Sequence, residues 1–333
     1  MLMRYLKGYS LLLVASLMAC SKGSNEPDKI GNWISRGQYD GVGRSGAASF
    51  VINDKAYVGT GYDGENRRQD FWVYDPALNL WKQIALFPGA GRNGAVGMAM
   101  AGKGYVGTGY DGLNKLNDFY QYDPVANTWT KKADFAGTAR YGAVSFALQD
   151  KGYIATGYDG NWLKDNWQYD PATNTWNQAQ SLNNGKRTDA AVFVIGNKAY
   201  VCMGIANGSF VTDFYAFDGT TQTWSTLRPI DNLSDESYDD NYNFKGSSAA
   251  SFAMRGLGYV VSGNKGSLSS ATWEYNPGTD TWIQRTDFEG AARTGATGFT
   301  LKDRGFVVLG TSSSQPFDNM FEFDPTAAYN KND

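Results

Sequence analysis

The sequence predicts an all-β fold, a six-bladed β-propeller whose ring is closed by an N-terminal strand. Two observations lead to this prediction. Six tryptophans lie 48, 48, 47, 48 and 58 residues apart: Trp33, Trp81, Trp129, Trp176, Trp224 and Trp282. The composition joins 15% aromatic residues to 40 glycines and only 9 prolines, the balance of short strands linked by tight turns. A period near 50 residues indicates a ring of four-stranded blades.

The second repeat shows how each blade is divided into strands. Residues 94–101 are small and apolar, as expected of a strand buried on both faces near a crowded axis. Residues 105–109 return after a turn, and residues 118–122 alternate between apolar and polar. The turn around Pro124 then leads into residues 128–133, a polar outer strand.

Two further positions recur with the tryptophans. Five tryptophans follow an aromatic residue by seven positions, as in YDPVANTW: the aromatic residues are Tyr74, Tyr122, Tyr169, Phe217 and Tyr275. Five tryptophans precede an arginine by eleven positions: the arginines are Arg44, Arg92, Arg140, Arg187 and Arg293. After Trp224 the matching position is Gly246, 22 residues on, so eleven residues have been inserted there.

These motifs resemble the Kelch repeat over about residues 30–327. The family's glycine pair is reduced to one glycine in every repeat: Thr60-Gly61, Thr108-Gly109, Thr156-Gly157, Met203-Gly204, Ser262-Gly263 and Leu309-Gly310. The resemblance implies a propeller. It also implies that arginines near the recurring position can line a pocket for acidic ligands, as in some Kelch proteins.

The two ends of the chain should complete one blade together. The last repeat ends without a tryptophan, whereas Trp33 stands alone, 48 residues before Trp81 and 11 before Arg44. We therefore expect residues 32–35 to be the outer strand of the C-terminal blade, which leaves no free seam in the ring.

The first twenty residues read as an export signal with a lipobox. Arg4 and Lys7 precede an apolar stretch that is too short to span a bilayer of ~30 Å. Residues 17–20, LMAC, resemble the bacterial lipobox, which implies a lipid on Cys20; an ordinary cleaved signal is the alternative. Residues 21–30 suit a flexible tether and residues 31–333 form the propeller. We expect an outer-membrane lipoprotein, periplasmic or surface-exposed, that contacts the membrane through its lipid only.

The absence of histidine excludes several classes of enzyme. Ser/His/Asp and Cys/His nucleophiles, histidine-bound zinc and the copper site of galactose oxidases are all ruled out. The formal charge of −3 gives no reason to expect a nucleic-acid partner. We expect no metal, no cofactor and a monomer, with Cys202 as a buried small apolar residue inside a strand.

The arginines and three loops should share one face of the ring. Strand direction places the five arginines at the mouth of the axial channel, where guanidinium groups could bind carboxylate or phosphate. The alternative is that each arginine pairs with an aspartate or carbonyl of the neighbouring blade and serves structure alone. On the same face lie three Tyr-Asp-Gly loops, which offer stacking surfaces and hydrogen-bond acceptors to a sugar, although Asp-Gly is also simple turn chemistry. Their candidate residues are Tyr62, Asp63, Tyr110, Asp111, Tyr158 and Asp159.

The insertion at residues 231–244 contains five acidic residues and no basic one. We expect a solvated acidic loop that leans toward the arginines, with a calcium site as the alternative. For the whole chain we expect a non-catalytic module that recognises a glycan or an acidic peptide or protein. The alternative is a sugar-active enzyme of the sialic-acid mutarotase type, although no residue pair stands out as catalytic.

Overall fold

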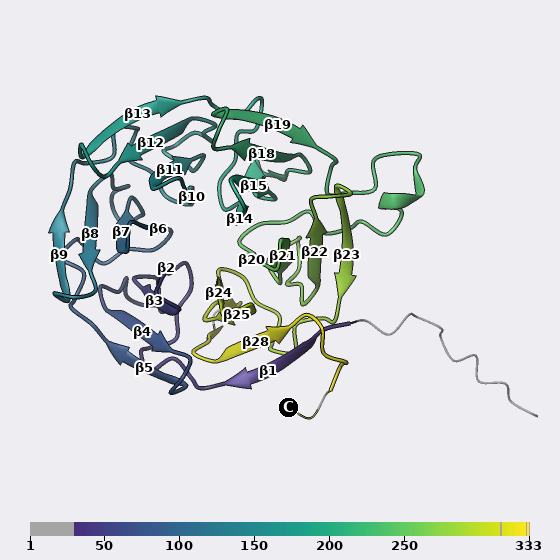
Figure 1. The fold of residues 1–333 in the computed structure, drawn as a ribbon, viewed down its shortest axis with the longest axis horizontal. Coiled ribbons are helices and arrows are strands. Elements are labelled where there is room, and N and C mark those ends of the chain that lie inside the picture. Colours follow the sequence, from purple (N-terminus) through teal and green to yellow (C-terminus); the bar gives the residue numbers. More distant parts are fainter. Residues whose placement is uncertain (1–29, 314, 331, 333) are drawn as a thin grey trace, which may run out of the picture.

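The computed structural model describes residues 30–313, 315–330 and 332, and it confirms the six-bladed β-propeller (Figure 1). Each blade is a four-stranded antiparallel sheet, with its first strand at the axis and its fourth at the rim (Figure 1). The signal sequence, Cys20 and residues 21–29 of the tether lie outside the described residues. Within the described part of the chain, no helix has the length and apolar character needed to cross a membrane.

The first three blades are contiguous in sequence. They consist of β2 (Ala48–Ile52), β3 (Lys55–Gly59), β4 (Phe71–Asp75) and β5 (Leu80–Gln83); β6 (Val96–Met100), β7 (Lys103–Gly107), β8 (Phe119–Asp123) and β9 (Thr128–Lys131); and β10 (Val144–Leu148), β11 (Lys151–Ala155), β12 (Asn166–Asp170) and β13 (Thr175–Ala179).

The last three blades carry the additions to the basic plan. They consist of β14 (Ala191–Ile195), β15 (Lys198–Cys202), β18 (Phe214–Asp218) and β19 (Thr223–Leu227); β20 (Ala250–Met254), β21 (Leu257–Val261), β22 (Thr272–Asn276) and β23 (Thr281–Arg285); and β24 (Thr297–Leu301), β25 (Arg304–Val308), β28 (Met320–Asp324) and β1 (Asn32–Arg36). Two small hairpins extend loops of the fourth and sixth blades: β16 (Ile205–Ala206) with β17 (Ser209–Phe210), and β26 (Thr311–Ser312) with β27 (Gln315–Pro316). One short 3-10 helix, η1 (Ser237–Asp239), lies in the insertion.

The seven-residue spacing from aromatic residue to tryptophan follows from the hairpin of the third and fourth strands. Tyr122 on β8 lies directly opposite Trp129 on β9, with ring centroids 4.9 Å apart. The turn between them is fixed by Asp123, whose Oδ1 accepts the Val125 amide, and by Asn127 at φ +53°. Cross-strand aromatic pairs of this kind stabilise a sheet and cover its face.

The hydrophobic core lies between the blades. One buried cluster joins Phe50 and Tyr57 of the first blade to Val106 and Tyr122 of the second. Phe50 and Tyr57 stack at 5.1 Å, and Tyr57 lies 5.6 Å from Tyr122. Each blade therefore buries its apolar faces only when both neighbours are in place.

The predicted ring closure is confirmed. β1 pairs with β28 in an antiparallel register that places Trp33 opposite Phe323. Trp33 is fully buried and packs 4.7 Å from Phe323 and 5.0 Å from Phe288. Near the two ends of the chain, Gly31 N donates to Ala327 O at 3.0 Å and Asn330 N to Asn32 Oδ1 at 2.7 Å.

A closed ring of backbone hydrogen bonds surrounds the axis. One residue of each blade, two positions after the arginine position, takes part in this ring. Its backbone amide donates to the carbonyl of the equivalent residue in the preceding blade, at 2.8–2.9 Å. The six residues are Gly46, Gly94, Gly142, Asp189, Ser248 and Gly295. All six have left-handed backbones, with φ between 53° and 64°. We call these six residues the axial ring. They join all six blades where the first strands begin.

The insertion does not lie where the sequence predicted. Instead of leaning toward the arginines, it projects from the outer rim beside β23 (Figure 1). Phe244 stacks on Trp273 at 4.4 Å, and Tyr242 contacts the Trp282 amide through its hydroxyl. These apolar contacts hold the insertion against the fifth blade. Among the residues described, no group of three or more acidic or cysteine side chains could hold a metal ion.

Candidate functional site

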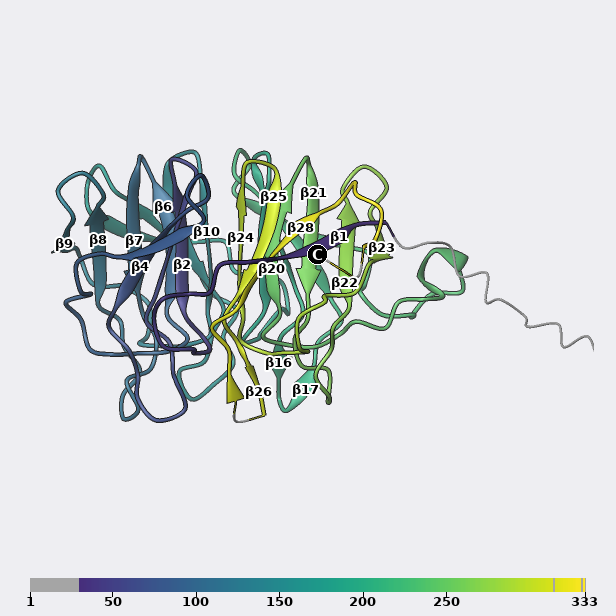
Figure 2. The ribbon, with the colours of Figure 1, turned by 90° about the horizontal axis from the view of Figure 1, so that it is seen from below.

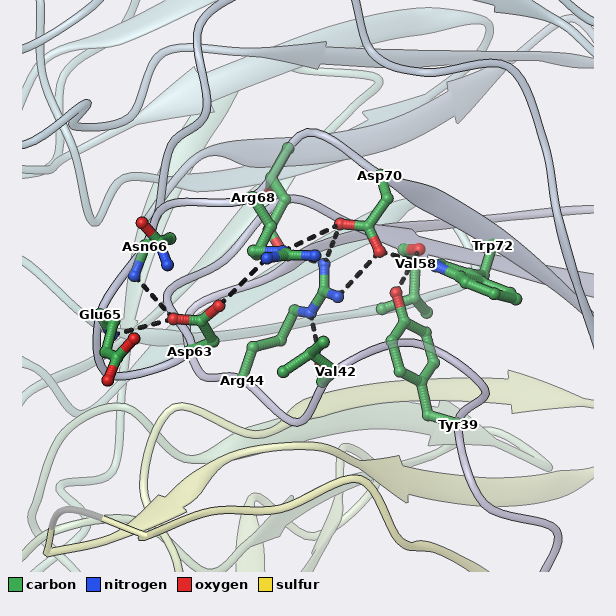
Figure 3. Close-up of polar contacts among 11 residues, drawn as sticks. Tyr39, Val42, Arg44, Val58, Asp63, Glu65, Asn66, Arg68, Asp70 and Trp72 are labelled. Carbon is green, nitrogen blue, oxygen red and sulfur yellow. Dashed lines mark hydrogen bonds and ion pairs between the residues drawn. The ribbon is translucent and has the colours of Figure 1, made fainter.

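The five recurring arginines are fully buried. The prediction that their side chains line the mouth of the channel is therefore wrong. Arg44 shows the pattern (Figure 3). Its Nε donates to Val42 O at 2.8 Å, and its Nη1 and Nη2 donate to the two carboxylate oxygens of Asp70 at 2.7 and 2.8 Å. Nη1 also donates to Thr60 O at 3.1 Å. Burial raises the pKa of Asp70, but the hydrogen bonds and charge of Arg44 outweigh it and hold that pKa below its usual range.

The same arrangement recurs in the other blades that carry the arginine. Arg92, Arg140 and Arg187 pair with Asp118, Asp165 and Asp213, and each also donates to a carbonyl two positions before itself. The partner aspartate lies in the same blade, just before the third strand, and not in the neighbouring blade as the structural alternative assumed. The arginines therefore fix the loop between the second and third strands of their own blade.

The exceptions strengthen this structural role. In the fifth blade Gly246 takes the arginine position: Gly204 N donates to Gly246 O just as Gly61 N donates to Arg92 O. Ala271, whose carbonyl accepts the Ser262 amide, takes the place of the aspartate. The blade that lacks the cation thus also lacks the anion.

The sixth blade keeps its arginine but pairs it with an amide. Arg293 Nη1 donates to Asn319 Oδ1 at 2.8 Å, and its guanidinium lies 4.3 Å from the Phe317 ring centroid. Burial lowers the pKa of Arg293 to about 10. Aromatic faces supply part of the stabilisation that a carboxylate gives elsewhere.

The aspartates of the Tyr-Asp-Gly loops act mainly in their own turns. Asp111 Oδ1 accepts the amides of Leu113 and Asn114 at 2.8 and 2.6 Å, and these hydrogen bonds lower the pKa of Asp111. Asp63 accepts two loop amides in the same way and contacts Arg68 at 3.3 Å (Figure 3). Asp159 accepts the Asn161 amide and the Thr138 hydroxyl. Turn chemistry therefore accounts for these three carboxylates.

The tyrosines of the same loops form part of a continuous row. Five aromatic side chains and one arginine follow one another across three blades with separations of 4.8–5.7 Å: in order, Tyr62, Arg67, Tyr110, Tyr141, Tyr158 and Trp162. All six are half-buried. We call this set the tyrosine row. It brings together the three predicted tyrosines and three residues that the sequence did not single out.

Arg67 is held rigidly inside the row. Its guanidinium lies 4.9 Å from the Tyr62 centroid and 4.8 Å from the Tyr110 centroid, and its Nε donates to Asn93 Oδ1 at 2.8 Å. The Tyr62 and Tyr110 hydroxyls donate to the carbonyls of Gly64 and Gly112, which fixes both rings. A preorganised surface of this kind loses little side-chain entropy on binding.

The row lies on the face where the first strands begin. Tyr62 bridges to Ser45, Tyr110 to Asn93 and Tyr158 to Tyr141, and each of these partners directly follows a buried arginine. Figure 2 shows the corresponding loops of the fourth and sixth blades, labelled β16, β17 and β26, projecting from the lower edge of the ring. The predicted sharing of this face by arginine positions and Tyr-Asp-Gly loops therefore holds for the backbone, although the arginine side chains turn inward.

The axial channel opens onto this face. A cavity of about 500 Å³ lies between the first strands, and a hollow of about 160 Å³ lies at the end formed by the axial ring. Six alanines line both spaces: Ala47, Ala95, Ala143, Ala190, Ala249 and Ala296. Asp189 is the one ionisable residue that lines either space in the described part of the chain.

Cys202 is confirmed as a buried residue of a second strand. It lies in β15, has no exposed surface and is a free thiol. Burial raises the pKa of Cys202 to about 12, so the thiolate is not formed near neutral pH.

Comparison with known proteins agrees with this architecture. Residues 43–85, 105–135 and 139–183 match the Kelch motif. The chain folds as a Kelch-type propeller. These matched segments lie in the three blades that carry the tyrosine row. A solved structure described as "Structure of YjhT" superposes with a TM-score of 0.73 at 17% identity, covering 86% of this chain and 95% of that chain. No curated protein sequence matches the sequence of this chain.

Proposed function

We propose that this Kelch-type propeller is a non-catalytic recognition module that binds a glycan along the tyrosine row. The single observation that carries the proposal is the row itself: five aromatic rings and Arg67, spaced at 4.8–5.7 Å over three adjacent blades. Aromatic rings stack on the apolar faces of sugar rings while their polar edges and neighbouring groups hydrogen-bond hydroxyls. An extended row suits an oligosaccharide better than a single sugar.

The buried arginines favour a glycan over an acidic peptide or protein. The five guanidinium groups that would attract an acidic ligand have no exposed surface, and four of them are neutralised by aspartate. Two cations remain at the row: Arg67 and Lys115, whose Nζ lies 5.8 Å from the Tyr158 ring centroid. An acidic ligand would therefore meet these two charges and none of the five recurring arginines, in a chain with a formal charge of −3.

The proposal includes export and attachment to a membrane. The apolar signal and the LMAC motif support a lipid on Cys20 of a bacterial outer-membrane lipoprotein. A glycan-binding module on a cell envelope would then be tethered through residues 21–30. Labelling of growing cells with a radioactive or clickable fatty acid tests this part. Label on the wild-type protein and none on a Cys20→Ala variant would support it, and equal labelling of both, or none on either, would refute it.

A glycan array with matched variants tests the binding surface. We expect Tyr110→Ala and Trp162→Ala to reduce binding of the best glycan at least tenfold, because each removes one stacking partner from the row. Tyr120→Ala is the matched control: Tyr120 is half-buried on β8 and lies away from the row. Binding that is unchanged in both row variants would refute the proposed surface.

The enzymatic alternative has its own measurement. A mutarotase of the sialic-acid type can use carboxylates together with an arginine that holds the acid, and the five recurring arginines are buried. Anomer interconversion of sialic acid followed by NMR, with and without the purified protein, decides the matter. Acceleration that is lost on mutation of the tyrosine row would replace the recognition module with an enzyme.

A further inference from the structure

The axial ring breaks its own pattern at one position. Four of its six residues are glycine and one is serine, but the fourth blade contributes Asp189. The backbone of Asp189 is left-handed, at φ +56°, as are those of the glycines. Aspartate tolerates this conformation better than most residues but still at a cost relative to glycine. Because aspartate has a higher conformational free energy here than the glycine of four other blades, its presence indicates a role for its side chain.

The carboxylate of Asp189 lies inside the hollow at the mouth of the channel. A β-carbon built on Gly142 would come within 2.7 Å of Asp189 Oδ1, so the side chain extends over the neighbouring third blade. Tyr141, the residue before Gly142, belongs to the tyrosine row and interacts electrostatically with Asp189. The carboxylate therefore lies beside the middle of the row.

The protein itself does little to satisfy this carboxylate. Among the described residues, the Thr188 hydroxyl is its side-chain donor, 3.3 Å from Oδ2, but the same hydroxyl lies equally 3.3 Å from Gly142 O, and no lysine or arginine forms an ion pair with Asp189. Burial raises the pKa of Asp189 to about 6. Most other aspartates at recurring positions have a cation or several amides as partners. Asp189 has neither, so its carboxylate is available to accept hydrogen bonds from a ligand.

We propose that Asp189 binds a primary ammonium group of the ligand, so that the row selects glycans built from amino sugars with free amines. The inference rests on the proposed function of the tyrosine row and adds the chemical class of its ligand. An ammonium group supplies the missing positive charge and up to three hydrogen-bond donors.

An ammonium group fits this position better than a metal ion. The part of the chain that the structure describes offers no cluster of three acidic or cysteine ligands anywhere. Of the six axial-ring carbonyls, each already accepts the amide of the next blade. One carboxylate with one hydroxyl is a poor site for a divalent cation, which takes six to eight oxygen ligands in the case of calcium.

Calorimetric titration with two tetrasaccharides tests the inference. The probes are the β-1,4-linked tetramers of glucosamine and of N-acetylglucosamine, which share a backbone and differ in the free amine. At pH 6.5 we expect the wild-type protein to bind the amine tetramer at least tenfold more tightly than the acetylated one. Asp189→Asn and Asp189→Gly should both abolish that preference. The glycine variant restores the residue that four blades carry, so it keeps the fold.

A matched control separates local from overall charge. Asp54→Asn removes one negative charge on the opposite face, from an exposed residue whose φ of +54° resembles that of Asp189. We expect this variant to keep the preference. Preference retained in both Asp189 variants, with Tyr110→Ala still weakening both tetramers, would overturn the inference and leave the row as a glycan site. No binding of any glycan by the wild-type protein would overturn both.

Discussion

Replacement of Arg140 by methionine tests whether the recurring arginines hold the blades together. The guanidinium of Arg140 has no exposed surface and donates to Asp165 at 2.6 and 2.8 Å. It also donates to Thr138 O and Thr156 O, both at 2.9 Å. Methionine fills a similar volume without any donor, so the variant leaves a carboxylate and two carbonyls without their partner.

The expected cost follows from what remains behind. Removing one partner of a buried ion pair costs about 3–5 kcal/mol. The Asp165 side chain is 22% exposed, so water can reach it and the lower end, about 3 kcal/mol, applies. The double variant Arg140→Met/Asp165→Ala imitates the fifth blade, which has Gly246 and Ala271 at these positions. It leaves the two carbonyls without their donor and the half-buried Trp167 indole N–H, which donates to Asp165 Oδ2 at 2.7 Å, without its acceptor. For these neutral groups together we expect about 2 kcal/mol.

Urea unfolding followed by tryptophan fluorescence measures these free energies. The protein has ten tryptophans, and Trp176 packs within 5.0 Å of Phe135 beside Arg140. The double variant should be more stable than Arg140→Met. A single variant within about 1 kcal/mol of the wild type would refute the structural role. So would a double variant less stable than Arg140→Met.

Four further predictions concern the ring and its axis. Trp33→Ala should lower the free energy of unfolding by about 3–5 kcal/mol, measured by the same urea assay, because it empties the core of the closing strand. Gly94→Ala should cost about 1–2 kcal/mol, since φ is +62° and the new β-carbon would lie 3.3 Å from Gly142 N; equal stability would contradict the need for glycine in the axial ring. Folding raises the pKa of Asp189 to about 6, so between about pH 4 and 6 this carboxyl binds more protons in the folded state than in the unfolded state. The wild type should therefore lose about 1–2 kcal/mol relative to Asp189→Gly as the pH rises from 4 to 7, and parallel pH profiles would disprove this. Cys202 should react with a thiol reagent only after denaturation, and rapid labelling of the native protein would show that β15 opens.

The sequence was sufficient for the fold because the blades repeat. The seven-residue spacing from Tyr122 to Trp129 corresponds to two residues that face each other across a hairpin. The regular pattern of aromatic residues therefore predicted the order of the strands. The solitary Trp33 and the incomplete last repeat were enough to predict the closure. Strand ends were less certain: the second strand of the second blade begins at Lys103, two residues before the prediction.

The position of the arginine side chains was not predicted, although the sequence held a signal. Each arginine with a carboxylate partner has an aspartate 25 or 26 residues later, directly before the third strand: Asp70, Asp118, Asp165 and Asp213. The repeat without the arginine has Ala271 there. This co-occurrence within one chain indicates a buried pair, which recurrence of the arginine alone cannot distinguish from a ligand site.

The candidate functional residues could be found from the repeats only in part. Arg67 and Trp162 lie in loops whose lengths differ between blades, so only the folded structure shows that they continue the tyrosine row. Asp189 could have been found by aligning the repeats, since the tripeptides after the arginine positions read SGA, NGA, YGA, TDA, SSA and TGA. A charged residue in a column of glycines is visible without a structure, but its place at the channel mouth is not.

The pairing of β1 with β28 also sets the order in which the molecule can be completed. β1 precedes the other strands in the chain, yet its partner residues lie 284–292 positions later, so Trp33 cannot dock until β28 has been synthesised. The five blades between them can form from hairpins of short sequence separation, whereas closure must bring together the two most distant segments of the chain. We therefore expect closure of the ring to be the last step of folding and release of β1 to be the first step of unfolding. A protease or a pulling force applied at residue 30 would act first on the pairing of β1 with β28.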